Sequence, residues 1–144
     1  MRILGQQMGV IHELAKAKYL LDNGCAVVVF RKKNNEIRVM LCTRSPITCG
    51  AVGLEAHIGN KNEASLEANG NITVMDLIAG ETRIFNINRV MYSLWMLEVA
   101  NPDEVEMIFE AYNFCKEQWP QYDDLDPIKQ SVFLNTFSYP GFNH

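Results

Sequence analysis

Few side chains in this sequence have a type and spacing that could support catalysis, and the strongest candidates lie between residues 42 and 57. Cys42, Cys49 and His57 could supply three metal ligands, but a fourth ligand is not evident and the spacing fits no zinc-finger pattern. A cysteine–histidine nucleophile pair would also need His57, because His12 and His144 lie near the chain ends. The sequence therefore predicts that the protein is not an enzyme and uses no metal or cofactor.

The sequence can also be compared with the patterns of nucleotide-binding and calcium-binding loops. The glycines of residues 45–70 lack both the lysine of a phosphate-binding loop and the spacing of a dinucleotide-binding turn. The aspartates of residues 123–126 lack the glycine and final glutamate of a calcium-binding loop. The function is therefore expected to depend on surfaces that bind another molecule.

The composition is that of a globular protein that acts inside a cell. The 144 residues are 48% hydrophobic and 21% charged, which is enough apolar side chain to form a core. The longest strand-like apolar run, Ala26–Phe30, is far shorter than the ~20 residues of a membrane-spanning helix. The four cysteines form no CxxC motif or disulfide framework, so a reducing cytosol is expected.

The net charge of −4 conceals two halves of opposite sign. Through Leu97 there are eleven lysines and arginines against eight acids, a net charge of +3. From Glu98 onward there are two bases and nine acids, a net charge of −7. A basic half can attract phosphate and an acidic half suits a basic protein surface, although the two halves could also pack together and neutralise each other.

Seven cations of the first half are candidates for a surface that binds RNA or single-stranded DNA, through phosphate pairing beside aromatic side chains. They are Arg31, Lys32, Lys33, Arg38, Arg44, Arg83 and Arg89. Alternatively, the lysines are ordinary turn charges, and the last two arginines pair with Asp76 or Glu81.

The second half offers a surface for a protein partner. Residues 101–118 have helical periodicity, and one face of this helix carries Asp103, Glu106, Glu110 and Glu117. Tyr139 and Phe142 in the following tail are candidate anchors of the same interface. The alternatives are a solvated helix face and a tail that packs onto its own domain.

The hydrophobic patterning predicts an α+β protein with three regions: an N-terminal helix in residues 1–24, a strand-rich unit in residues 25–99, and an acidic helical extension in residues 100–144. Residues 45–70 are expected to form a long internal loop, in which Glu63–Ala68 is expected to form one helical turn. Asn34 and Asn35 predict a two-residue hairpin turn. The expected helices are 6–22, 101–118 and 126–137, and the expected strands are 25–32, 36–43, 72–77, 81–87 and 90–99. Strand 25–32 is expected to be covered on both faces, because its apolar run is continuous. Asn101 and Asp126 are the expected helix caps. The residues expected to pack inward from the last two helices include Ile108, Tyr112, Cys115, Ile128 and Val132.

The strand-rich unit also resembles a known family. Residues 27–44, with the sequence VVVFRKKNNEIRVMLCTR, are similar to the opening hairpin of the WYL-like, Sm-like small β-barrel family of tailed phages. Residues 72–77 and 83–90 are similar to the end of that barrel, so the resemblance covers about residues 26–92. It implies a small antiparallel barrel in a non-catalytic phage accessory protein made in the bacterial cytoplasm. The one N-terminal and two C-terminal helices expected from the periodicity are predicted to pack on this barrel.

Together, these observations predict a non-catalytic host-takeover or anti-defence protein. It would bind and modulate a bacterial host macromolecule, most simply a protein of transcription or defence, and no membrane. RNA or single-stranded DNA binding by the basic face is the alternative.

Overall fold

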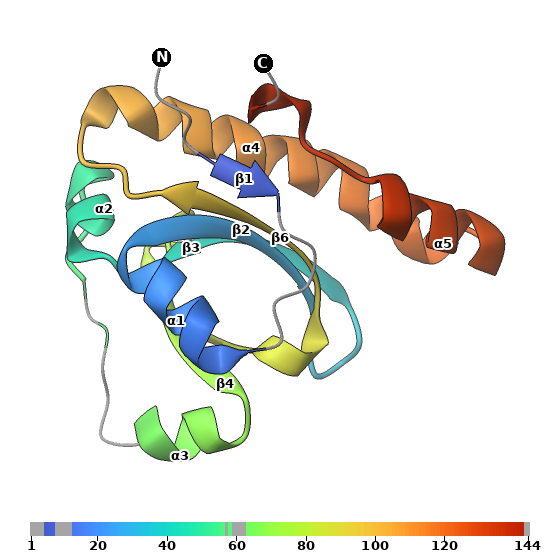
Figure 1. Cartoon of the computed structure of the whole chain (residues 1–144), viewed down its shortest axis with the longest axis horizontal. Helices are drawn as coiled ribbons and strands as arrows, with labels where there is room; N and C mark the ends of the chain where they lie inside the picture. The colour runs from blue at the N-terminus through green and yellow to red at the C-terminus, as the bar shows by residue number, and fades with distance from the viewer. Residues whose placement is uncertain (1–4, 8–12, 57, 59–62, 143–144) are drawn as a thin grey trace.

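The computed structural model describes residues 5–7, 13–56, 58 and 63–142, and in them it has an α+β fold (Figure 1). One antiparallel sheet has the strand order β1-β6-β2-β3-β4-β5. The strands are β1 (Gly5–Gln7), β2 (Gly24–Arg31), β3 (Ile37–Thr43), β4 (Asn71–Asp76), β5 (Glu81–Asn86) and β6 (Val90–Leu97). The α-helices are α1 (Leu14–Asp22), α2 (Pro46–Ala51), α3 (Glu63–Ala68), α4 (Val105–Gln118) and α5 (Pro127–Thr136). The α+β class is confirmed.

The predicted number of helices is wrong, because α2 was not expected in the long loop of residues 45–70 and α3 was expected there only as one helical turn. The start of α2 has a clear local cause. Ser45 accepts a hydrogen bond from the Thr48 backbone N–H, and Pro46 occupies the first helical turn.

Strand β2 lies in the middle of the sheet and separates two apolar cores. Its odd-numbered side chains, such as Val27, contact the core under α4, whereas even-numbered ones, such as Val28, contact the core against α1. Successive side chains of a strand point to opposite faces, so a continuous apolar run needs cover on both. This confirms the expectation that both faces of this strand are buried.

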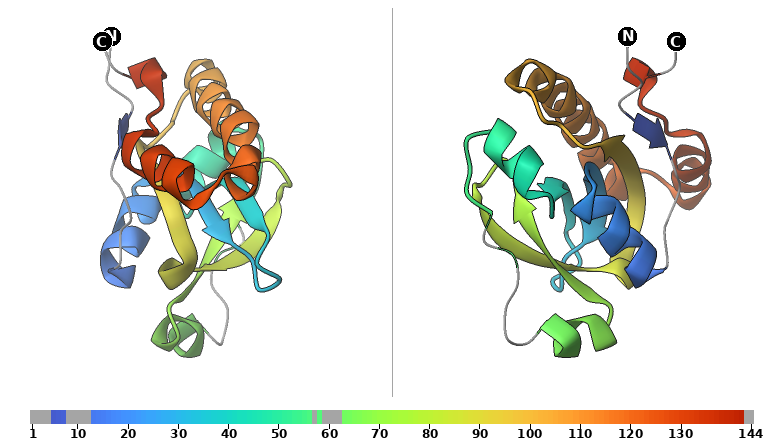
Figure 2. Two further views of the ribbon diagram at one scale, coloured as in Figure 1. Left: turned by 90° about the vertical axis from the view of Figure 1, so that its right-hand side faces the viewer. Right: turned by 60° about the vertical axis from the view of Figure 1, so that its left-hand side comes forward.

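The sheet is strongly bent but open (Figure 2). Strands β3 and β4 share only two residue pairs, Cys42 with Asp76 and Thr43 with Met75. Strands β1 and β5 form the two edges of the hydrogen-bonded sheet. The predicted antiparallel sheet is therefore confirmed. The strand pairs of the described residues do not close this sheet into a barrel.

The turn between β2 and β3 has three residues, so the prediction of a two-residue turn is wrong. The Lys32 N–H donates to the Glu36 carbonyl at 2.9 Å, which leaves Lys33, Asn34 and Asn35 in the loop. Asn35 has a φ of 71°, the left-handed conformation that asparagine tolerates and that a three-residue hairpin needs at this position. The extra residue sets the register that pairs Arg31 with Ile37.

The predicted helix of residues 6–22 is wrong at its start. Residues Gly5–Gln7 form β1, which pairs with β6 from Gly5 opposite Met96 to Gln7 opposite Leu94. The free hydrogen-bonding edge of β6 offers partners that an isolated first helical turn with a glycine does not. Helix α1 itself begins at Leu14.

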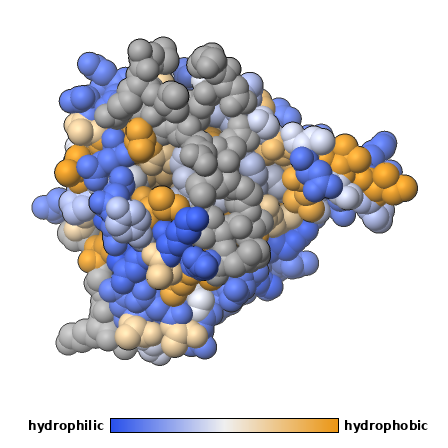
Figure 3. Space-filling view, in the orientation of Figure 1, coloured by the Kyte–Doolittle hydropathy of each residue, from blue (hydrophilic) through white to orange (hydrophobic). Residues whose placement is uncertain are grey.

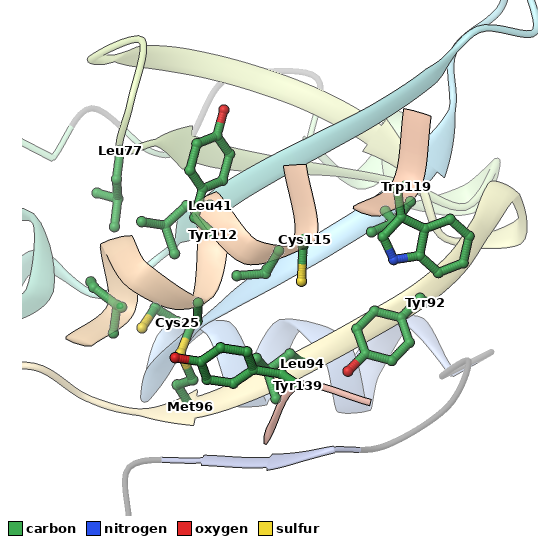
Figure 4. Close-up of a cluster of buried hydrophobic side chains, with 14 of the residues drawn as sticks. Cys25, Leu41, Leu77, Tyr92, Leu94, Met96, Tyr112, Cys115, Trp119 and Tyr139 are labelled. Carbon is green, nitrogen blue, oxygen red and sulfur yellow. The ribbon is translucent and has the colours of Figure 1, made fainter. Parts of the chain in front are cut away.

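The C-terminal elements follow the predicted periodicity closely. Helix α4 buries Ile108, Tyr112 and Cys115, and Trp119 after its last turn is fully buried (Figure 4). Three short 3-10 helices flank α4 and α5: η2 (Pro102–Glu104), η3 (Trp119–Asp124) and η4 (Pro140–Phe142). The expected Asp126 cap of α5 is present, because its side chain accepts from the Lys129 N–H. The expected side-chain cap from Asn101 is not formed.

Candidate functional site: a cationic pocket and an acidic helix face

The seven cations predicted to bind nucleic acid do not form one surface. Arg44 is the clearest case, because its side chain is only 7% exposed. It donates to the Asp22 carboxylate at 2.8 Å, the Glu63 carboxylate at 2.8 Å and the Thr73 carbonyl at 2.6 Å. Arg44 therefore joins α1, β4 and α3 within the fold and is not presented to a ligand.

Arg38 and Arg83 border a shallow hollow of about 370 Å³ between the hairpin, β5 and α4. Arg83 pairs with the Asp76 and Glu81 carboxylates at 3.0 and 2.7 Å, as the alternative interpretation expected. Arg38 is half-buried and forms no ion pair within the described residues. Because carboxylates share this hollow, its field is mixed, and it is a weak site for an anion.

The remaining four cations surround a second cavity, of about 320 Å³, which we call the hairpin pocket. Its lining residues come from the β2–β3 hairpin, α3, β4, β5 and the 3-10 helix η1 (Ile87–Arg89). They are Phe30, Arg31, Lys32, Lys33, Leu66, Asn71, Ile84, Phe85, Asn86 and Arg89. None of these described lining residues is acidic, so the lining of this pocket favours an anion.

Short-range contacts hold this pocket in shape. Phe30 and Phe85 stack at its base with their ring centroids 5.5 Å apart. The Asn86 amide donates to the Asn69 carbonyl at 2.9 Å and to the Asn71 side-chain oxygen at 3.1 Å. The Arg89 guanidinium donates to the Lys32 carbonyl at 2.6 Å, which ties η1 to the hairpin turn.

Two of the four pocket cations already have partners. Arg31 pairs with Asp123 at 2.7 Å; the hydrogen bond to this carboxylate raises the pKa of Arg31 and lowers that of Asp123. Lys32 lies 3.5 Å from the Glu36 carboxylate, a long and exposed pair. Lys33 forms no ion pair within the described residues, and the described contacts of Arg89 include no carboxylate.

The acidic face is Asp103, Glu106, Glu110 and Glu117, and all four side chains are exposed as predicted. None of them forms an ion pair with another described residue. Asp103 lies in η2 and the other three acids lie in α4, where they span about 16 Å at a rise of ~1.5 Å per residue. The face is therefore an extended row of negative charge without compensation from the rest of the described fold.

An apolar surface that the sequence analysis missed lies on α5. Ile128 is 78% exposed, Val132 is 55% exposed and Leu134 is 44% exposed. In Figure 3 this part of the molecule is a hydrophobic projection at the right. Helix α5 packs beside the end of α4 through Phe133 and Phe137. The four-residue spacing of Ile128 and Val132 was the available signal, but sequence alone predicted that these residues pack inward.

Tyr139 and Phe142 are the two tail residues that were predicted to anchor an interface. Tyr139 is only 8% exposed and lies against Phe114, with the ring centroids 5.4 Å apart, so it belongs to the core and is not an exposed anchor. Its pKa is raised, chiefly by burial. The side chain of Phe142 lies outside the described residues.

Two cysteines that could have supported metal binding or catalysis lie in different cores. Cys42 contacts the core against α1, whereas Cys49 belongs to the core under α4. Burial raises the pKa of both thiols, which disfavours the reactive thiolate. Within the described residues no cluster of three metal-binding side chains occurs, and His57 lies outside them.

Comparisons with known proteins give no match: no family model, no curated protein and no solved structure is similar to this chain. In the described part of the chain, no helix combines the length and apolar character needed to cross a membrane.

Proposed function

We propose that the protein is a non-catalytic binding protein that docks the acidic face of α4 on a basic surface of a bacterial host protein and modulates it. One observation carries the proposal. The four carboxylates of this face are exposed and unpaired within the described fold, whereas Arg31, Arg44 and Arg83 are paired internally. The charge left available on α4 is negative, and it complements a protein rather than a nucleic acid.

The apolar surface of α5 supports the same proposal. Protein interfaces combine an apolar centre with a polar or charged rim. The acidic face would steer the encounter and set the orientation, and Ile128 and Val132 would contribute the burial that lengthens the lifetime of the complex.

The biological setting is proposed from the family resemblance of residues 26–92. A phage accessory protein in the host cytoplasm would act on a protein of transcription or defence. A small barrel is the corresponding fold proposal, and the run of neighbouring strands β6-β2-β3-β4-β5 in the bent sheet supports it.

RNA or single-stranded DNA binding is the second candidate. The hairpin pocket favours it, because four of the predicted cations gather there beside two aromatic rings. Binding of this kind should weaken steeply with salt and should be lost in Arg89→Glu.

Affinity capture from bacterial lysate, with and without nuclease, separates the two candidates. A host protein captured through α4 should persist after nuclease and should bind Glu106→Lys/Glu110→Lys at least about tenfold more weakly. The single variants Glu110→Lys and Glu13→Lys make a matched pair, because Glu13 is an exposed acid on a different helix end. Equal binding by these two variants, or loss of the partner on nuclease treatment, would contradict the proposal.

A further inference from the structure

The hairpin pocket has hydrogen-bond donors that the fold does not use. Lys33 has no partner within the described residues, and Arg89 uses only Nη1 in its contact with the Lys32 carbonyl. The Asn71 side chain accepts from Asn86 through its oxygen, and its Nδ2 has no described partner. These donors come from the hairpin turn, η1 and β4, so they surround the cavity from three elements.

The remainder of the lining is apolar. Ile84 is 48% exposed and Leu66 is half-buried, and both line the cavity together with Phe30 and Phe85. The cavity volume of about 320 Å³ falls at the small end of pockets that hold organic ligands. Its occupant should therefore combine a compact apolar ring system with a concentrated negative charge.

We propose that the hairpin pocket binds a nucleoside monophosphate group, with the phosphate held by Lys33 and Arg89 and the base lying against Ile84 and Leu66. Arginine and lysine are the side chains that recognise phosphate, the first as a planar donor fork and the second as a point charge. The Asn71 amide supplies a neutral donor for a ribose or base acceptor. This site is separate from the acidic face of α4.

The same chemistry can come from a free mononucleotide or from the phosphorylated end of a strand. Binding of a long nucleic-acid strand across the surface is not favoured, because cations beyond the pocket lie beside carboxylates. Arg83, for example, pairs with Asp76 and Glu81. A compact ligand needs only the pocket itself.

Calorimetric titration of the full chain with AMP, adenosine and inorganic phosphate tests the proposal. AMP should bind at least about tenfold more tightly than adenosine, which lacks the phosphate. Hydrogen bonds from Lys33 and Arg89 to a charged phosphate contribute more free energy than a tenfold change in affinity requires. Lys33→Gln/Arg89→Gln should lose about tenfold or more in AMP affinity. Ile84→Ser should weaken AMP but leave inorganic phosphate unchanged.

The matched control is Lys16→Gln/Lys129→Gln, which removes two exposed cations from α1 and α5 and should bind AMP within about twofold of wild type. A 5′-phosphorylated oligonucleotide identifies the source: it should match AMP if strand ends are the ligand and bind more weakly if free nucleotides are. No saturable binding below about 10 mM AMP, or equal loss in both double variants, would overturn the proposal. Amide NMR shifts confined to residues outside the pocket would also overturn it.

Discussion

Replacing Arg44 with alanine should lower the free energy of unfolding by about 3 kcal/mol, because this side chain is a buried connection and not a ligand contact. Its hydrogen bond to Asp22 contributes roughly 0.5 kcal/mol, since that carboxylate is 45% exposed and screened. The bond to Glu63 contributes about 1.5 kcal/mol, and loss of the donor to the Thr73 carbonyl costs about 1 kcal/mol more.

Urea unfolding followed by tryptophan fluorescence measures this change, and it corresponds to roughly 10 °C in melting temperature for a chain of this size. Arg38→Ala is the matched control, because Arg38 lies on β3, the strand that Arg44 directly follows, and has no ion pair among the described residues. It should cost less than about 0.5 kcal/mol. Arg44→Lys should lie between the two, because one ammonium group cannot replace the planar fork at three separated acceptors.

The reasoning would be refuted if Arg44→Ala unfolded within about 0.5 kcal/mol of Arg38→Ala. A stable Arg44→Ala protein that had lost a nucleic-acid ligand would show that Arg44 belongs to the binding surface. A destabilised protein that keeps its ligands would place Arg44 in the fold alone.

Two further predictions concern titration. Thiol reagents at about pH 8 should leave native Cys25 and Cys115 unmodified, because burial raises the pKa of each thiol to about 12. Rapid labelling of these cysteines without denaturant would contradict this packing. The melting temperature should fall as the pH drops from about 5 to 3. Hydrogen bonds from arginines hold the pKa values of Glu63 and Asp123 below their ordinary 4.5 and 3.8 in the folded chain. The unfolded chain therefore binds more protons than the folded chain in this pH range, which favours unfolding. The fall should be shallower in Glu63→Gln/Asp123→Asn, and a steeper fall would oppose the assignment.

The buried thiols also show why two cysteines that are close in the sequence need not share a site. Cys42 and Cys49 are close along the chain, but β3 and α2 direct them into different cores. Sequence spacing reports proximity along the backbone, whereas a metal site or nucleophile pair needs convergence in space.

Local patterns in the sequence determined the elements that depend on nearby residues. The apolar run of β2 predicted a strand covered on both faces, because alternate side chains point to opposite sides. The spacing of Ile108, Tyr112 and Cys115 predicted the buried face of α4, and the exposed acids followed on its other side. The Asp126–Pro127 pair predicted the start of α5, because an aspartate cap followed by proline favours the first turn of a helix.

Only the tertiary structure decided which charges and aromatic rings remain available to another molecule. The sequence placed Arg44 and Lys33 in the same set of candidate cations, but long-range contacts bury the first, while the second lines a pocket. Tyr139 packs into the core, while Ile128 is exposed. Pairing partners and burial depend on segments that are distant along the chain, and periodicity within one segment carries no information about them.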